Sequence, residues 1–228
     1  KKSLVSYYEH NLRQRGEQIL ARLKAGESCA LCTDAGMPAI SDPGCDIVRL
    51  CHEAGVPVAA VPGPSAVTTA LALSGLDTGR FVFDGFLSTS RKSRFEHLAA
   101  LKNEPRTIVL YEAPHKLRRT LDDLFEALGE RQIALCREMT KLHEEVLRTT
   151  LGEAIAHFTA TPPKGEFVLV LAGAPEEAKE VPTGTDAAAR VAELMAQGLS
   201  RKDAVKQTAQ ELELPKNAVY AAALGETE

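Results

Sequence analysis

Tryptophan is absent from the 228 residues, and the other aromatic residues make up only 5% of them, so the core is expected to be aliphatic. No apolar run approaches the roughly 18 residues that a membrane-spanning helix needs, which argues against an integral membrane protein. Basic residues are not in excess, since 27 stand against 31 acidic residues for a net charge of −4. Any nucleic-acid binding must therefore come from a local patch.

The sequence also lacks the glycine motifs of common nucleotide sites. Neither G-x-G-x-x-G nor G-x-x-x-x-G-K-[ST] occurs, so neither a dinucleotide site nor a nucleoside triphosphate site is supported. Hydrophobic residues at 44% and charged residues at 25% are typical of a folded protein and exclude wholesale disorder.

Five cysteines occur without a secretory segment, which predicts reduced thiols and a cytoplasmic protein. Cys29 and Cys32 form a C-x-x-C pair inside an apolar run that resembles a buried strand. Positions i and i+3 of a strand face opposite sides, so the two sulfur atoms should diverge. No second Cys/His pair has zinc-finger spacing, and no metal site is expected.

Strand-like and helix-like segments alternate along the chain, which predicts an α/β fold with a largely parallel sheet. The segments 132–136 and 146–149 are too close for a crossover helix, which predicts an antiparallel pair and a mixed second sheet. The expected strands are Ser28–Thr33, Pro57–Val61, Phe81–Phe86, Thr107–Tyr111, Gln132–Cys136, Val146–Thr149 and Phe167–Ala172. The expected helices are 4–23, 44–54, 65–73, 93–101, 114–128 and 151–159.

Composition divides the chain into an α/β domain over 1–79, a second α/β domain with a mixed sheet over 80–174, and a Pro- and Gly-containing linker over 175–186. The first domain has only two strand candidates, and stable sheets usually have three or more, so a first strand is expected upstream of the chain.

Residues 187–228 predict a small helical unit. Helices over 187–197, 200–212 and 216–224 resemble a helix-turn-helix, with Ser200 and Asp203 placed as a capping pair. Two interpretations stay open. One is nucleic-acid contact through exposed basic and polar residues, namely Arg201, Lys202, Lys206, Lys216 and Asn217. The other is a bundle that docks on the enzyme or on a partner.

Two loops have the features of ligand-binding segments. The loop over 33–44 follows a predicted strand, is longer than most βα connections, and contains Gly36, which would let a ligand approach the backbone. The loop over 61–66 reads Val-Pro-Gly-Pro-Ser-Ala, and Ser65 is placed to cap the following helix and expose its backbone N–H groups. In open α/β sheets, ligands bind outside the carboxyl ends of strands.

Charged residues cluster at the strand ends of the second domain. The candidates for one cleft are Glu112, His115, Glu138, Lys141, Glu144 and Glu166. The segment from Arg91 to Arg119 carries eight basic and three acidic residues, which predicts a phosphate-contacting patch. For that patch we select Arg91, Lys92, Arg94, Arg118 and Arg119.

Five motifs together carry a resemblance to a known family. They are the segments 33–44 (TDAGMPAISDPG), 61–66 (VPGPSA), 111–115 (YEAPH), 137–141 (REMTK) and 164–168 (KGEFV). In these motifs the chain strongly resembles the bacterial 16S ribosomal RNA (cytidine-2′-O)-methyltransferases of the tetrapyrrole methylase-like superfamily. The resemblance covers nearly the whole chain, including the helix-turn-helix-like unit.

The resemblance implies two α/β domains with S-adenosylmethionine (SAM) in the cleft between them, a homodimer, and a cytidine at position 1402 of 16S ribosomal RNA in the small ribosomal subunit as the methylated residue. The cofactor residues that it implies are Asp34, Ala35, Gly36, Met37, Ile40, Ser65, Ala66, Glu112, Met139, Gly165 and Phe167. Many superfamily members read Gly-Asp-Pro where this chain has Met37, which favours a substrate other than a tetrapyrrole.

SAM carries its own activated methyl group, so alignment of the ribose hydroxyl can supply most of the acceleration. A general base could add roughly 10²–10⁴-fold. We expect this base to be Glu112, Glu138, Glu166 or His115, with Lys141 near the phosphate. Two alternatives stay open: a superfamily methyltransferase acting on a tetrapyrrole or a protein side chain, and a non-catalytic metabolite-sensing DNA-binding regulator.

Overall fold

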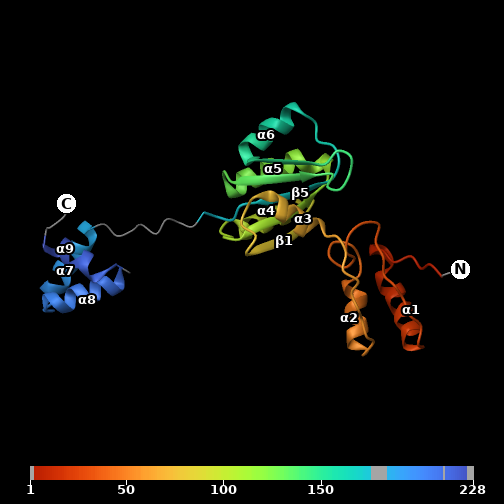
Figure 1. The fold of residues 1–228 in the computed structure, drawn as a ribbon, viewed down its shortest axis with the longest axis horizontal. Coiled ribbons are helices and arrows are strands. Elements are labelled where there is room, and N and C mark those ends of the chain that lie inside the picture. The colour runs from red at the N-terminus through yellow and green to blue at the C-terminus, as the bar shows by residue number, and fades with distance from the viewer. Residues whose placement is uncertain (1–2, 176–183, 213, 225–228) are drawn as a thin grey trace. The chain divides into compact units, whose positions relative to one another are not determined.

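The computed structural model describes residues 3–175, 184–212 and 214–224, and it comprises two compact units, residues 1–174 and 175–228 (Figure 1). The helices of the first unit are η1 (Glu9–Asn11), α1 (Leu12–Lys24), α2 (Cys45–Glu53), α3 (Ala66–Ser74), α4 (Arg91–Leu101), α5 (Pro114–Leu128) and α6 (Leu151–Ala160). Its strands are β1 (Phe81–Phe86), β2 (Thr107–Glu112), β3 (Gln132–Arg137), β4 (Glu145–Thr150) and β5 (Phe167–Leu171).

The first unit is built on a five-stranded mixed sheet with the order β1-β2-β5-β3-β4. The pair β1–β2 is parallel, whereas β5 runs antiparallel to both β2 and β3, and β3 is antiparallel to β4 as predicted. The fold class is α/β, but this sheet is mainly antiparallel rather than largely parallel. The reason is that β5 enters between β2 and β3, where every one of its five side chains is buried.

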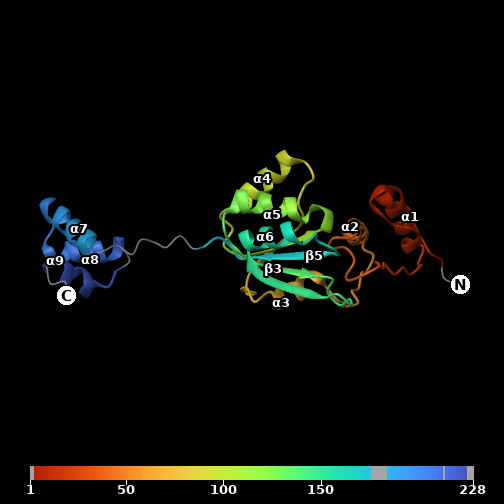
Figure 2. The same cartoon turned by 90° about the horizontal axis from the view of Figure 1, so that it is seen from above.

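Helices cover both faces of the sheet (Figure 2). The helices α4, α5 and α6 pack on one face, where α5 contributes Leu117, Leu121 and Leu124 to the larger hydrophobic cluster. Helix α3 packs on the other face through Val67, Ala70 and Leu71. We call these the α5 face and the α3 face.

Local sequence signals account for the helix bounds on the α5 face. Helix α5 has Pro114 in its first turn, where the missing N–H costs nothing, and its leucines recur at helical spacing. Helix α6 starts at a capping box in which the Glu153 N–H donates to Thr150 Oγ1 at 3.4 Å. The predicted helix over 93–101 begins two residues earlier, at Arg91.

Two predicted strands are wrong. Residues 28–33 and 57–61 have no regular secondary structure, pair with no strand among the described residues, and are mostly exposed. A strand needs a neighbour that satisfies its backbone N–H and C=O groups, and here none is supplied. The C-x-x-C pair accordingly lies on an exposed segment, with Cys29 and Cys32 as free thiols. The predicted helix over 4–23 begins only at Leu12, after the short turn η1.

The second unit contains α7 (Gly184–Ala196), α8 (Arg201–Glu211) and α9 (Lys216–Leu224) around its own small core. The predicted cap of α8 is confirmed, because the Asp203 N–H donates to Ser200 Oγ at 3.2 Å. Most of the predicted linker, residues 176–183, lies outside the described residues. Residues 1–174 form one compact unit. The predicted division of this unit at residue 79 stays a prediction.

Candidate active site

The two predicted ligand loops contact each other. A Cβ placed on Gly36 would lie 3.4 Å from the carbonyl oxygen of Pro64, and one placed on Gly63 would lie 3.4 Å from Met37 Sδ. Gly36 has a φ of +74°, a conformation that glycine adopts without strain. The ends of the first loop are held by Thr33 Oγ1, which donates to Asp42 Oδ2 at 2.8 Å.

Tyr111 packs on the α3 face, near the start of α3. Burial raises the pKa of the Tyr111 hydroxyl, the Val67 N–H in the first turn of α3 opposes this, and the Asp42 carboxylate adds to the rise. The tyrosine ring stacks edge-on against Phe83 and Phe86, with ring centroids 5.0 and 5.6 Å apart. Sequence reasoning missed these three rings, because Phe83 and Phe86 share a face only through the register shift between Phe83 and Gly85, which pairs them with Val109 and Tyr111. Strict period-2 alternation along β1 would have placed them on opposite faces.

The predicted cap of α3 is wrong. Ser65 occupies the N-cap position, but its side chain makes no capping hydrogen bond. The remaining loop residues implied by the resemblance, Asp34, Ala35, Ile40 and Ala66, are exposed beside this pair of loops. Met139 packs, half-buried, against the same α3-face cluster as Tyr111. Met139 and the second loop, which leads directly into α3, are therefore the implied cofactor residues placed beside the α3 face.

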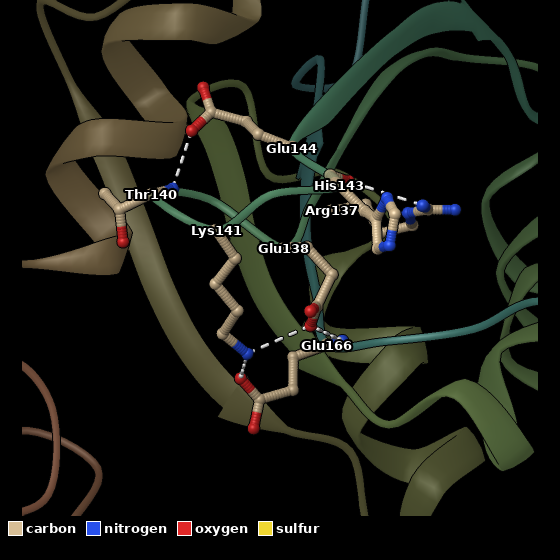
Figure 3. Close-up of polar contacts among 7 residues, drawn as sticks. All are labelled: Arg137, Glu138, Thr140, Lys141, His143, Glu144 and Glu166. Atoms are coloured by element: carbon tan, nitrogen blue, oxygen red, sulfur yellow. Dashed lines mark hydrogen bonds and ion pairs between the residues drawn. The ribbon is translucent and has the colours of Figure 1, made fainter.

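A second group of predicted residues forms a bracket between the β3–β4 connection and the start of β5 (Figure 3). Lys141 Nζ lies 3.0 Å from Glu138 Oε1 and 2.9 Å from Glu166 Oε2. The Glu166 N–H donates to Glu138 Oε1 at 2.9 Å, and the Glu138 N–H donates back to the Glu166 carbonyl at 3.0 Å. We call Glu138, Lys141 and Glu166 the carboxylate bracket.

The bracket is closely fitted and carries backbone strain. Glu138 and Thr140 have φ angles of +49° and +65°, which non-glycine residues rarely adopt. The Thr140 N–H donates to Glu144 Oε2 at 2.6 Å, which holds the turn (Figure 3). Gly165 has a φ of +81°, and a Cβ there would lie 2.4 Å from Glu138 Cγ. The close approach of Glu138 therefore requires glycine at position 165.

Electrostatics in the bracket favour the charged forms. The Glu166 N–H, and then Lys141, hold the pKa of the Glu138 carboxyl below its ordinary value. Glu166, and then Glu138, raise the pKa of Lys141. A carboxylate with a lowered pKa is a weaker proton acceptor, so this environment suits Glu138 for positioning rather than for general-base chemistry.

Other predicted residues lie on the α5 face. Glu112 is 4% exposed and accepts from Thr120 Oγ1 at 2.5 Å and from the Ala113 N–H at 2.8 Å. Phe167 is buried edge-on against Phe158, with ring centroids 5.6 Å apart. His115 is exposed in the first turn of α5. Strand alternation thus separates Glu112 and Phe167 from the residues on the α3 face.

Only some residues of the predicted basic patch are exposed on the surface. Arg91 and Lys92 are exposed and pair with Glu126 and Glu96 at 3.7 and 4.0 Å, and Arg118 is exposed. Arg94, by contrast, is 5% exposed, and its Nη2 lies 2.7 Å from Asp123 Oδ2. Arg91, Lys92 and Arg94 lie in the first turn of α4.

Within the described ranges, no three His, Cys, Asp or Glu side chains are placed to hold a metal ion together. No helix in the described part of the chain has both the length and the apolar character needed to cross a membrane.

Comparison with known proteins places this geometry in a family. Residues 2–155 match the family described as Tetrapyrrole (Corrin/Porphyrin) Methylases, and residues 182–227 match the RsmI C-terminal HTH domain. Ribosomal RNA small subunit methyltransferase I of Synechocystis sp. is 48% identical over 95% of this chain and 78% of that protein. The protein of the same name from Bacillus subtilis is 42% identical over 95% of this chain and 76% of that protein.

Solved structures support the fold at low sequence identity. The methyltransferase CobJ is 18% identical and superposes with a TM-score of 0.55 over 71% of each chain. A diphthine synthase is 15% identical, with a TM-score of 0.50 over 75% of this chain and 70% of that chain. The family match and the similarity to these relatives show that the chain belongs to the tetrapyrrole methylase family and, within it, to the ribosomal RNA small subunit methyltransferase I group.

Proposed function

We propose that this chain transfers the methyl group of SAM to the 2′-oxygen of a cytidine ribose in 16S ribosomal RNA of the small ribosomal subunit. The observation that carries the proposal is the contact of the loops at Gly36 and Pro64 beside Tyr111, in a chain of this methyltransferase family. The small-subunit RNA named for the relatives supplies the substrate class. Action on ribosomal RNA also favours a cytoplasmic location.

The residues on the α3 face fit the cofactor. Two glycines at the loop contact leave backbone accessible, and the uncapped first turn of α3 presents N–H groups near Ser65 and Ala66. Exposed Phe86 and half-buried Tyr111 add aromatic surface on the same face, which suits a sulfonium cation and an adenine ring. We assign the holding of SAM to Gly36, Met37, Ser65, Ala66 and Met139.

SAM when bound supplies a methyl group on a sulfonium, and the 2′-oxygen of the ribose displaces the thioether while its proton is lost. Residues of the chain then have two tasks: to align the ribose and to receive the proton. The bracket holds the β3–β4 turn in one conformation, and Met139 extends from this turn to the α3 face. Lys141 is the cation at this turn, and we assign it to orientation of the backbone phosphate next to the cytidine.

Glu166 is the base candidate that the geometry favours. Its side chain is 84% exposed and is held by Lys141, so it can meet a substrate. Glu138 is tied by the Glu166 N–H and by Lys141, and Glu112 points into the α5 face. We therefore assign acceptance of the 2′-hydroxyl proton to Glu166 and a positioning role to Glu138.

Labelled SAM and hypomethylated small ribosomal subunits test the proposal. Incorporation should map to the 2′-oxygen of one cytidine, and Glu166→Gln should lower kcat by roughly 10²–10⁴-fold with little change in SAM affinity. Glu53→Gln is the matched control, because it removes another exposed carboxylate that is paired with a cation, Arg49 at 3.1 Å, and it should retain turnover. Lack of incorporation into subunits would contradict the function, and wild-type turnover by the Glu166 variant would contradict the assignment of the base. Free 16S RNA and duplex DNA, compared at stated salt, distinguish a DNA-binding regulator.

The helical unit and the homodimer belong to the same proposal. Arg201, Lys202, Lys206, Lys216 and Asn217 are all exposed, which supports RNA contact by α8 and α9. Replacing the four basic residues by Gln should weaken subunit binding without changing SAM binding. Light scattering of the full chain at increasing concentration tests the homodimer that the resemblance implies.

A further inference from the structure

A cavity of about 70 Å³ opens on the α5 face, away from the loops assigned to SAM. It lies at the carboxyl ends of the parallel strands β1 and β2, where α4 and α5 begin. Ser88, Thr89 and Arg94 line it from the β1–α4 side, and Glu112, Lys116 and Arg119 line it from the β2–α5 side. With a water taking roughly 30 Å³ of liquid volume, the cavity suits a group of a few non-hydrogen atoms.

Arg94 is the buried cation of this cavity, and its donors are not all used. Its Nη1 donates to the Ser88 carbonyl at 3.1 Å, and its Nη2 forms the ion pair with Asp123. Its Nε is buried and has no hydrogen-bond partner among the described residues. An unmatched guanidinium N–H away from water is costly, and an anionic oxygen would satisfy it.

The first turn of α4 adds further donors. Ser90 is the N-cap residue, but its side chain makes no capping hydrogen bond, so the first N–H groups of an 11-residue helix are left for another acceptor. Lys116 is half-buried at the wall and forms no ion pair within the part of the chain that the structure describes. Arg119, also on α5, lines the cavity and lies 3.8 Å from Asp123.

The charges suit a singly charged anion. Arg94, Lys116 and Arg119 face two carboxylates, those of Glu112 in the wall and Asp123 behind the arginines. The Glu112 oxygens accept from Thr120 and from the Ala113 N–H, and among the described residues no hydrogen bond joins Glu112 to Lys116. One positive charge remains, which matches a phosphodiester better than a doubly charged phosphate.

We propose that the cavity formed by Ser88, Thr89, Arg94, Lys116 and Arg119 binds a phosphodiester of the RNA backbone, as a site separate from the SAM loops. The inference rests on the proposed function for the identity of the substrate. This site differs from a diffuse basic patch because it contains a buried guanidinium and one half-buried lysine, whereas Arg91 and Lys92 are exposed. Strand alternation places this site on the face of β2 opposite to Tyr111.

Equilibrium binding of hypomethylated small subunits to the full chain tests the site without requiring turnover. Arg94→Gln would also break a buried ion pair, so the working variants are Lys116→Gln and Arg119→Gln. Lys102→Gln is the matched control, because Lys102 is an exposed cation at the other end of α4. Each variant removes one charge, and thermal unfolding of each variant tests whether it remains folded.

Lys116→Gln should weaken binding about tenfold and lower the slope of log affinity against log salt by roughly 0.7–0.9, whereas Lys102→Gln should leave both unchanged. Dimethyl phosphate, added at constant ionic strength, should compete with subunits for the wild type and for Lys102→Gln but not for Lys116→Gln. Equal behaviour of Lys116→Gln and Lys102→Gln would overturn the inference, as would stronger competition by inorganic phosphate than by the diester. Methylation by the wild type is measured separately, so its absence would indicate failure of the proposed function instead.

Discussion

Replacing Gly165 by alanine should disrupt the carboxylate bracket by a steric effect. The added Cβ would lie 2.4 Å from Glu138 Cγ and 2.7 Å from its Cδ and Oε1, well inside any normal contact. Alanine at a φ of +81° costs about 1–2 kcal/mol for the left-handed backbone alone. Overpacking adds about 1–3 kcal/mol if the glutamate shifts only in part.

Two other glycines separate these contributions. Gly26 and Gly55 have φ angles of +91° and +69°, and an added Cβ would meet nothing within 4 Å at either. Gly26→Ala and Gly55→Ala should therefore show the backbone cost, and Gly165→Ala should exceed both by about 1–3 kcal/mol. Urea unfolding followed by far-ultraviolet circular dichroism measures the free energy of unfolding for all three variants.

The clash has a second signature in a double variant. All three clashing atoms belong to the Glu138 side chain, so Glu138→Ala should remove most of the excess cost of Gly165→Ala. Gly165→Ala should also lower kcat more than the two control variants, since Glu138 would leave Lys141. Equal unfolding free energies for the three glycine variants, or strict additivity with Glu138→Ala, would refute the reasoning.

Three further outcomes follow from the structure. Arg106 holds the pKa of Glu104 down at about 2, so the stability that this pair contributes is full above the ordinary value of 4.5 and is lost as the pH falls through about 2. Glu104→Gln should therefore reduce the fall of the melting temperature at acid pH. An unchanged fall would contradict the pairing. Burial raises the pKa of the Cys136 thiol to about 11, so iodoacetamide at pH 8 should alkylate the three exposed cysteines well before Cys136. Mass spectrometry counts the alkylated cysteines, and equal rates would contradict the burial of Cys136. At Gly173 an added Cβ would lie 2.0 Å from the Pro105 carbonyl oxygen, so Gly173→Ala should lower the unfolding free energy by 3 kcal/mol or more, roughly the upper range for overpacking, and a cost near zero would show that the backbone yields.

Local signals predicted much of the fold. Helix α5 has the predicted bounds because Pro114 starts it and its leucines repeat at helical spacing, and β1 has the predicted bounds as well. The strands expected over 28–33 and 57–61 failed because pairing depends on a neighbour that a local pattern does not contain. The position of β5 between β2 and β3 is likewise a long-range property.

The site was predictable in residue type more than in placement. The Glu138, Lys141 and Glu166 side chains do meet, as their positions at strand ends suggested. The burial of Arg94 could not be read from a basic stretch, because its partner Asp123 lies on another helix. The separation of Glu112 from the α3 face follows from period-2 alternation along β2.

Tyr111 and Glu112 are neighbours in the chain, yet their side chains lie on opposite faces of the sheet. The tyrosine lies near the loops assigned to the methyl donor, and the glutamate lines the cavity assigned to the nucleic acid. A point substitution can therefore change one of the two proposed sites alone. Inserting or deleting one residue upstream in β2 would exchange the two side chains and so spoil both at once. In the proposed arrangement, the donor site and the RNA site thus both depend on the same pairing of β2 with β5.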